Sequence, residues 1–241
     1  MNYCILNGKK STMVKGLMIQ SLPLITKPLM RSRIEDIDGR DGDLVTKLGY
    51  SAYDREMSIG LFGDYDISEV IDYFNSDGDA IFSNELERVY KYQILNQIDY
   101  EKLGIFKQAK VTFHVQPFKY PSFDDSLTIE DGASVTKSAN LVNHGNIYAK
   151  PVIFVYGCPP TSFTMTINGQ TISISRGYLD PSDIMIDVEK MNAYFLTNGN
   201  YANRKVTADY SKIKLKAYDN NTFTWTGTCT RIVIKNISRW I

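Results

Sequence analysis

The chain has 241 residues, 43% of them hydrophobic, and its 27 Lys and Arg residues balance 27 Asp and Glu residues. That apolar content can build one large β domain or two ordinary domains, while the balanced charge argues against specific nucleic-acid binding. No apolar run approaches the roughly 20 residues of a membrane span, and the start MNYCILNGKKS lacks the order of a signal peptide, so we expect a protein made in a cytoplasm, without a membrane segment.

The first elements along the chain are predicted strands. Residues 3–11 and 13–20 predict an opening strand pair. The stretch RSRIEDIDGRDGD follows, and it places Arg40 and Asp41 between two glycines where a strand must turn. We interpret this stretch as a hairpin with an exposed loop.

The stretch DYDISEVIDYFNSDGD predicts a short amphipathic helix. Asp66 can cap its N-terminus with Glu69 three residues further on, and Tyr65 can pack on Val70 as a hydrophobic staple. Asp77-Gly78 is expected to end the helix. Its apolar face is formed by Ile67, Val70, Ile71 and Phe74.

Two long strands, VYKYQILNQIDY and FKQAKVTFHVQPFKY, come next. They predict a long hairpin over residues 89–118, joined by a short connection at residues 101–104. In the second strand the odd-numbered residues are apolar, namely Ala109, Val111, Phe113 and Val115. The even-numbered residues are polar, namely Lys110, Thr112, His114 and Gln116. His114, one of only two histidines, is therefore expected to face away from the core.

The second half of the chain predicts an all-β domain. The polar stretch PSFDDSLTIEDG predicts a boundary between residues 120 and 128, which gives one domain over residues 1–125 and a second over residues 126–241. Asn168-Gly169 is a strong hairpin signal, and residues 181–184 suggest at most one further helical turn. Strands are expected in AKPVIFVYG, SFTMTINGQTISI, GYLDPSDIMIDV, DYSKIKLKAY and GTCTRIVIKNI, which together predict a sandwich of jelly-roll type.

The residue types that carry chemistry show no usable spacing. His114 and His144 have no partners at metal-ligand spacing, and we expect Cys4, Cys158 and Cys229 to be free buried thiols. The adjacent Asp124 and Asp125 resemble a solvated turn more than a glycosidase pair. Neither a nucleophile elbow nor a phosphate loop is present. We therefore expect no catalytic, cofactor-binding or metal-binding residues, and no enzymatic activity.

Several segments together resemble a known family. SLPLITKPLMRSRIEDIDGRDGDL, YDREMSIGLF, DISEVIDYF and DAIFSNELERVYKYQILNQIDYEKLGIFKQAKVTFHVQPFKY are similar to the N-terminal domain of the distal tail protein, Dit, of long-tailed siphophages of Gram-positive hosts. NHGNIYAKPVIFVYG, FTMTINGQTISI and the closing RW are similar to the galectin-like C-terminal sandwich of that family. The resemblance covers nearly the whole chain.

The resemblance implies a structural role in the virion, at the tip of a phage tail. Family members form a ring, usually a hexamer, through their N-terminal domains. The tail tube protein sits above this ring, the tail-associated lysin or fibre sits below it, and receptor-binding proteins attach around it. The N-terminal domain is then expected to carry one helix and a long hairpin on a sandwich-like β fold. Candidate subunit-interface residues are Arg40, Asp41, Lys110, Thr112, His114 and Gln116.

Two other functions remain as alternatives. The first is a carbohydrate-binding module that anchors a phage to host cell-wall polysaccharide, because aromatic residues are frequent in the predicted sandwich. The second half of the chain, about 110 residues long, leaves no room for an inserted sugar-binding domain, which argues against this alternative. The second alternative, a cell-wall hydrolase, has no catalytic constellation to support it.

Overall fold

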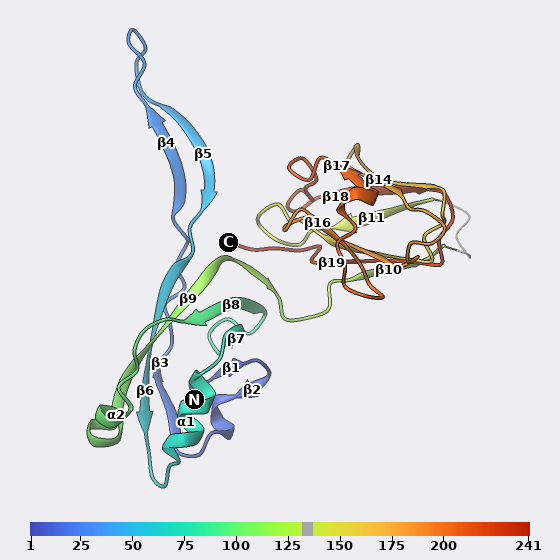
Figure 1. The fold of residues 1–241 in the computed structure, drawn as a ribbon. Coiled ribbons are helices and arrows are strands. Elements are labelled where there is room, and N and C mark those ends of the chain that lie inside the picture. Colours follow the sequence, from blue (N-terminus) through green and yellow to red (C-terminus); the bar gives the residue numbers. More distant parts are fainter. Residues whose placement is uncertain (132–136) are drawn as a thin grey trace. The chain divides into compact units, whose positions relative to one another are not determined.

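The computed structural model describes residues 1–131 and 137–241, and it is mainly β, as predicted (Figure 1). The chain divides into two compact units, Met1–Ser122 and Phe123–Trp240. Among the described residues, no helix has the length and apolar character needed to cross a bilayer.

The first unit contains a seven-stranded sheet, two helices and a separate two-stranded ribbon. The sheet order is β2-β1-β7-β8-β9-β6-β3, and β4 pairs only with β5. The elements in chain order are β1 (Cys4–Leu6), β2 (Lys9–Lys10), the 3-10 turn η1 (Ser11–Met13), β3 (Leu17–Ser21), β4 (Met30–Glu35), β5 (Leu44–Tyr50), β6 (Tyr53–Leu61), α1 (Ile67–Phe74), β7 (Gly78–Phe82), β8 (Arg88–Ile94), α2 (Tyr100–Phe106) and β9 (Gln108–Pro121).

The predicted opening strand pair was wrong. Asn7 and Gly8 both adopt positive φ, of 48° and 84°, so residues 3–11 form a small hairpin of their own, β1 with β2. β1 also pairs with β7, whereas β3 pairs with β6 at the opposite edge of the sheet. Pairing with β7 and with β6, which both lie far away in the sequence, therefore places β1 and β3 at separate positions in the sheet.

The predicted helix at residues 67–74 is confirmed as α1. The Asp66 side chain accepts hydrogen bonds from Ser68 N (2.9 Å) and Glu69 N (3.4 Å), which satisfies N–H groups of the first turn. Glu69 does not complete a capping box, because its carboxylate accepts a hydrogen bond from Lys15 N at 3.0 Å. The buried side of the helix is formed by Val70, Tyr73 and Phe74, while Ile71 is only half-buried.

The prediction of one helix and a short hairpin connection was also wrong. β8 ends at Ile94, and a second helix, α2, lies between it and β9. Asp99 caps this helix by accepting a hydrogen bond from Lys102 N at 2.9 Å, and Lys107 ends it in the left-handed conformation with φ 57°. Leu103 is completely buried in the core. Burial of one leucine thus favours a helical turn where the sequence suggested a tight loop.

The second unit is a sandwich of two five-stranded sheets, in which all paired strands are antiparallel. One sheet has the order β10-β19-β12-β15-β16 and the other β11-β18-β13-β14-β17. Its elements are β10 (Leu127–Glu130), β11 (Ser138–Val142), β12 (Val152–Tyr156), β13 (Ser162–Ile167), β14 (Gln170–Ser175), β15 (Ile184–Asp187), β16 (Asn192–Phe195), the 3-10 turn η3 (Asn203–Lys205), β17 (Val206–Ala208), β18 (Asn220–Thr226) and β19 (Arg231–Lys235).

One predicted strand of the sandwich does not form. The segment DYSKIKLKAY makes only an isolated bridge, between Leu215 and Ala149. Ile213 and Leu215 are nevertheless buried in the core of the unit. Alternating burial therefore explains the apolar pattern here, without ladder pairing. The Asn168-Gly169 hairpin between β13 and β14 is confirmed, with φ of 49° and 79°.

The paired aspartates at the start of the second unit have different environments. Asp124 is exposed and caps Ser126 N at 2.9 Å, as expected for a turn. Asp125 is half-buried and accepts a hydrogen bond from Ser238 N at 2.7 Å, and burial raises its pKa. The prediction of a solvated pair was therefore wrong for Asp125, which ties the end of the chain to the sandwich.

Candidate assembly surfaces

The seven-stranded sheet has one buried face and one polar face. Along β9, Val111, Phe113 and Val115 are completely buried, so the predicted alternation is confirmed. His114 therefore faces away from the core. We name the opposite side the outer face and define it by Asp54, Glu56 and Ser58 on β6 and by Lys110, Thr112, His114 and Gln116 on β9.

Charges on the outer face are paired across the two strands. His114 Nδ1 lies 2.7 Å from Asp54 Oδ1, and Lys110 Nζ lies 3.2 Å from Glu56 Oε2. Thr112 lies opposite Glu56 in the strand register. Because Lys110 is paired with Glu56 and His114 contacts Asp54, the outer face is polar without a large cluster of like charges. In the described parts of the chain, no group of three His, Cys, Asp or Glu side chains could hold a metal ion.

Replacing His114 with Ala is expected to change the free energy of unfolding by less than about 1 kcal/mol, because the imidazole is one-third exposed and its contact with Asp54 is at the surface. Urea denaturation provides the measurement. Val115→Ala, one residue further on the buried face, serves as the control and should cost clearly more. A loss with His114→Ala as large as that of the control would contradict the outer-face assignment.

The other two predicted interface residues lie on a different element. The β4–β5 ribbon, which we name the arm (residues 29–51), projects from the sheet of its own unit, and Arg40 and Asp41 lie in the loop at its tip (Figure 1). The structure thus brings Lys110, Thr112, His114 and Gln116 together on one surface. It places Arg40 and Asp41 on a second, separate surface.

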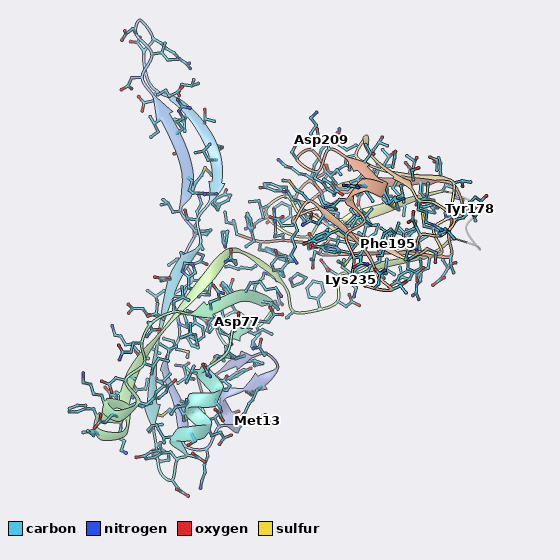
Figure 2. All side chains as sticks on the ribbon, in the orientation of Figure 1. Met13, Asp77, Tyr178, Phe195, Asp209 and Lys235 are labelled. Carbon is cyan, nitrogen blue, oxygen red and sulfur yellow. The ribbon has the colours of Figure 1, made fainter. Side chains whose placement is uncertain are left out.

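The arm is a two-stranded ribbon that no other element of its unit covers (Figure 2). Ile34 pairs with Val45 on one side, and their side chains are 60% and 53% exposed. Arg31 and Arg33 lie on the other side, where Arg33 pairs with Glu35. Both faces of an isolated two-stranded ribbon are open to solvent, so such a ribbon is only marginally stable by itself.

A buried arginine fixes the segment from which the arm starts. The terminal nitrogen Nη2 of Arg55 donates to the carbonyl oxygens of Pro23 (3.1 Å) and Leu24 (3.0 Å). Its guanidinium lies 4.3 Å from the ring centre of Tyr90, a cation–π contact in the core. Asn84 Nδ2 also donates to Pro23 O, at 3.0 Å.

Sequence reasoning missed Arg55 as a functional candidate. The sequence did contain a signal for the burial of Arg55, because residues two apart on a strand face the same side and Arg55 alternates with Met57 and Ile59, which are buried on β6. A second buried charge lies beside it, since Lys119 Nζ is 2.7 Å from Glu85 Oε1 and Glu85 also bonds the Tyr90 hydroxyl. Burial, and then this hydrogen bond, raise the pKa of Tyr90.

Comparison with known proteins identifies the fold. No protein-family model matches the chain, and no curated protein matches it. Among solved structures, the chain is similar to SPP1 Dit, which is described as a paradigm of hub adsorption apparatus in phages that infect Gram-positive hosts. The match has 19% identity and a TM-score of 0.66, and it covers 100% of both chains.

The phage P2 baseplate in its activated conformation with Ca is also similar. That match has 10% identity and a TM-score of 0.56, and it covers 100% of this chain and 98% of the other. Both matches extend across the first unit and the second. The chain therefore has, over its whole length, the fold of the SPP1 Dit hub protein.

Proposed function

We propose that the protein is a structural hub of a phage tail tip, present in the virion. Copies of the chain assemble into a hexameric ring that joins the tail tube protein to the tail-associated lysin or fibre and carries receptor-binding proteins. The observation that supports this proposal most is the full-length likeness of both units, in one order, to the Dit hub of SPP1. No enzymatic step is part of this role.

The surfaces of the first unit support assembly into a ring. A closed ring needs heterologous contacts, in which one surface of a subunit meets a different surface of its neighbour. The arm and the outer face are two such surfaces on different elements. The paired charges of the outer face also suit a ring through which DNA moves, because a strongly basic surface would retain phosphate groups.

The ring can be tested with a charge placed on the outer face. Thr112→Glu adds a second carboxylate to the outer face, opposite Glu56. Burying both carboxylates in a subunit contact would cost desolvation and like-charge repulsion, so we expect the variant to weaken the ring while each copy stays folded. Light scattering at high protein concentration, with the tail tube protein added, should show a hexamer-sized species for the native chain. The variant should show a smaller species.

Thr161→Glu provides the matched control, because Thr161 is an exposed loop residue of the second unit. It should assemble like the native chain. A native protein that stays monomeric with the tube protein present would contradict the hub proposal.

A native protein that stays monomeric would favour the carbohydrate-binding alternative. One pair of tyrosine rings on the sandwich supports that alternative. Tyr201, which is exposed, lies with its ring centre 5.1 Å from that of Tyr194 on the sandwich and could stack on a sugar. Pull-down with cell-wall polysaccharide, comparing the native chain with Tyr201→Ala, would then decide this alternative.

A further inference from the structure

Asparagine precedes glycine at three places in the chain, at Asn7, Asn168 and Asn198. Such a pair can lose the asparagine amide, because glycine has no Cβ and lets its backbone nitrogen approach the side-chain carbon Cγ of the residue before it. The two reacting groups belong to one chain, so the reaction needs no second protein. Its rate in the folded protein therefore depends on how firmly the surrounding structure holds each amide.

The amide of Asn7 is held against the start of β7. Its Nδ2 donates to Asp77 O at 2.9 Å, and its Oδ1 accepts a hydrogen bond from Asp79 N at 2.8 Å. A Cβ atom at Gly78 would lie 2.3 Å from Asn7 Oδ1, so the amide is also closely enclosed. Turning the amide toward its own backbone would break both hydrogen bonds.

The amide of Asn168 is held more strongly still, at the turn between β13 and β14. Its Nδ2 donates to Asn221 Oδ1 at 2.7 Å and to Lys214 O at 3.1 Å. Its Oδ1 accepts a hydrogen bond from Thr222 N at 3.1 Å. Asn221 is completely buried, so this network is part of the core of the second unit.

The amide of Asn198 has no such support. Asn198 lies in an exposed turn, residues 196–200, directly after β16. Its Oδ1 accepts one hydrogen bond, from Asn200 N at 3.0 Å, which is a contact within the turn itself. Its Nδ2 has no hydrogen-bond partner among the residues that the structure describes. No other segment therefore fixes this amide.

The contact with Asn200 also favours attack on the amide. When Gly199 N adds to Cγ of Asn198, negative charge develops on Oδ1, where the Asn200 N–H can stabilise it. Gly199 N itself donates to Phe195 O at 2.8 Å, and this bond has to open first. It lies in the same exposed turn, and such turns open locally at a small cost in free energy.

We propose that Asn198 is a site of spontaneous deamidation, whereas Asn7 and Asn168 are protected by the fold. Gly199 N forms a bond to Asn198 Cγ, the bond from Cγ to Nδ2 breaks, and the proton of Gly199 N passes through water to the departing ammonia. The product is a five-membered cyclic imide. One water molecule then opens either C–N bond of this ring and leaves aspartate or isoaspartate. No atom is oxidised or reduced.

The reaction would change the exposed surface around Tyr201. Each event adds one negative charge to a chain whose formal net charge is zero. Isoaspartate also places its side-chain carbon in the main chain and so lengthens the turn between Phe195 and Tyr201. This turn is closed by Phe195 N, which donates to Asn200 O at 2.9 Å, and Tyr201 forms a bridge with Tyr194. The tyrosine pair is therefore expected to change as the protein ages.

Mass spectrometry after incubation of the native chain at mildly alkaline pH tests the proposal. Each lost amide appears as the replacement of NH2 by OH, and fragment spectra assign it to one residue. Asn198 should react at least about tenfold faster than Asn7 or Asn168, since about 1.4 kcal/mol of protection is enough for each factor of ten. Equal rates at the three sites of the folded chain would overturn the proposal.

The chain unfolded in guanidinium chloride is the matched control. All three sites have the same Asn-Gly sequence, so their rates should agree within about threefold once the tertiary hydrogen bonds are lost. If Asn198 stayed tenfold faster in the unfolded chain, the difference would come from the neighbouring sequence, and the assigned protection of Asn7 and Asn168 would be wrong.

Asn198→Gln provides the second control. Glutamine keeps an exposed amide but has one more carbon, so its attack would need a six-membered ring. The mass change in the peptide of residues 191–204 should then disappear. That peptide also contains Asn192, Asn200 and Asn203, and a change that persists in the variant would assign the reaction to one of them and contradict the proposal. The chemistry belongs to the single chain and does not depend on the proposed ring.

Discussion

Replacing Asp131 with Asn is expected to lower the free energy of unfolding of the second unit by about 3 kcal/mol, the upper end for loss of a charged hydrogen-bond acceptor that leaves buried donors poorly paired. The Asp131 carboxylate is buried and bonds three groups. It pairs with Lys137, accepts Trp225 Nε1–H at 2.6 Å and accepts Cys229 N–H at 2.9 Å. The amide of the introduced asparagine has no charge to pair with Lys137, and its NH2 group would face an N–H donor where the carboxylate has an acceptor oxygen.

The effect should depend on pH in a defined direction. Burial alone would raise the pKa of Asp131, but Lys137, the Cys229 N–H and the Trp225 ring N–H together hold this pKa below its usual value. The carboxylate therefore contributes stability at pH values above its unfolded pKa of about 3.9, and the contribution disappears as the pH falls through the lower folded pKa. The difference between native chain and variant should shrink accordingly in acid.

Urea denaturation followed by tryptophan fluorescence measures this loss. Both tryptophans, Trp225 and Trp240, belong to the second unit, so the signal reports on that unit alone. Asp124→Asn is the control, because Asp124 is exposed and bonds only a turn, and it should leave the transition nearly unchanged. A loss of less than about 1 kcal/mol with Asp131→Asn would contradict the assigned role.

Replacing Gly145 with Ala is expected to displace the last residues of the chain and to cost about 3 kcal/mol, the upper end for overpacking. A Cβ atom at Gly145 would lie 1.8 Å from Arg239 O, a backbone atom that cannot rotate away. The closing segment is bound at this place, since His144 N donates to Ser238 Oγ at 3.1 Å and the buried Arg239 donates to Tyr148 O at 2.9 Å.

Detachment of this segment would expose Trp240, which is buried in the native protein. A red-shifted tryptophan emission, together with a lower urea midpoint, is therefore the expected signature. Gly104→Ala is the control, because an added Cβ there meets no atom within 4 Å in the α2 helix. This control should be neutral or slightly stabilising, as Ala favours helix more than Gly. Unchanged emission and stability in Gly145→Ala would show that the segment tolerates the clash by a small shift.

The parts of the fold that the sequence predicted correctly depend on local patterns. The α1 helix follows from the Asp66 cap and a 3.6-residue apolar period, and the two faces of β9 follow from strict alternation around Phe113. The Asn168-Gly169 turn needs positive φ at two successive residues, which few other residue types supply. The alternation along β9 also predicted the outer face, with His114 on it.

The parts that the sequence did not predict depend on distant contacts. The α2 helix exists because Leu103 is buried in a core built by other elements. The segment DYSKIKLKAY alternates like a strand, yet its apolar side chains enter the core without a ladder partner beyond one bridge. Apolar alternation reports burial, and only the presence of a neighbouring strand decides whether the backbone pairs.

The sequence by itself thus determined the mainly β class, the first helix, the polar face of β9 and the exposed loop with Arg40 and Asp41. Only the tertiary structure decided that β3 pairs with β6 from Ser58 onward, which leaves Asp54 and Glu56 at an open edge. Pairing between segments far apart in the chain depends on the whole sheet, so no local pattern could reveal this open edge. The same physical reason applies to Arg55, whose burial is set by aromatic residues from β7 and β8.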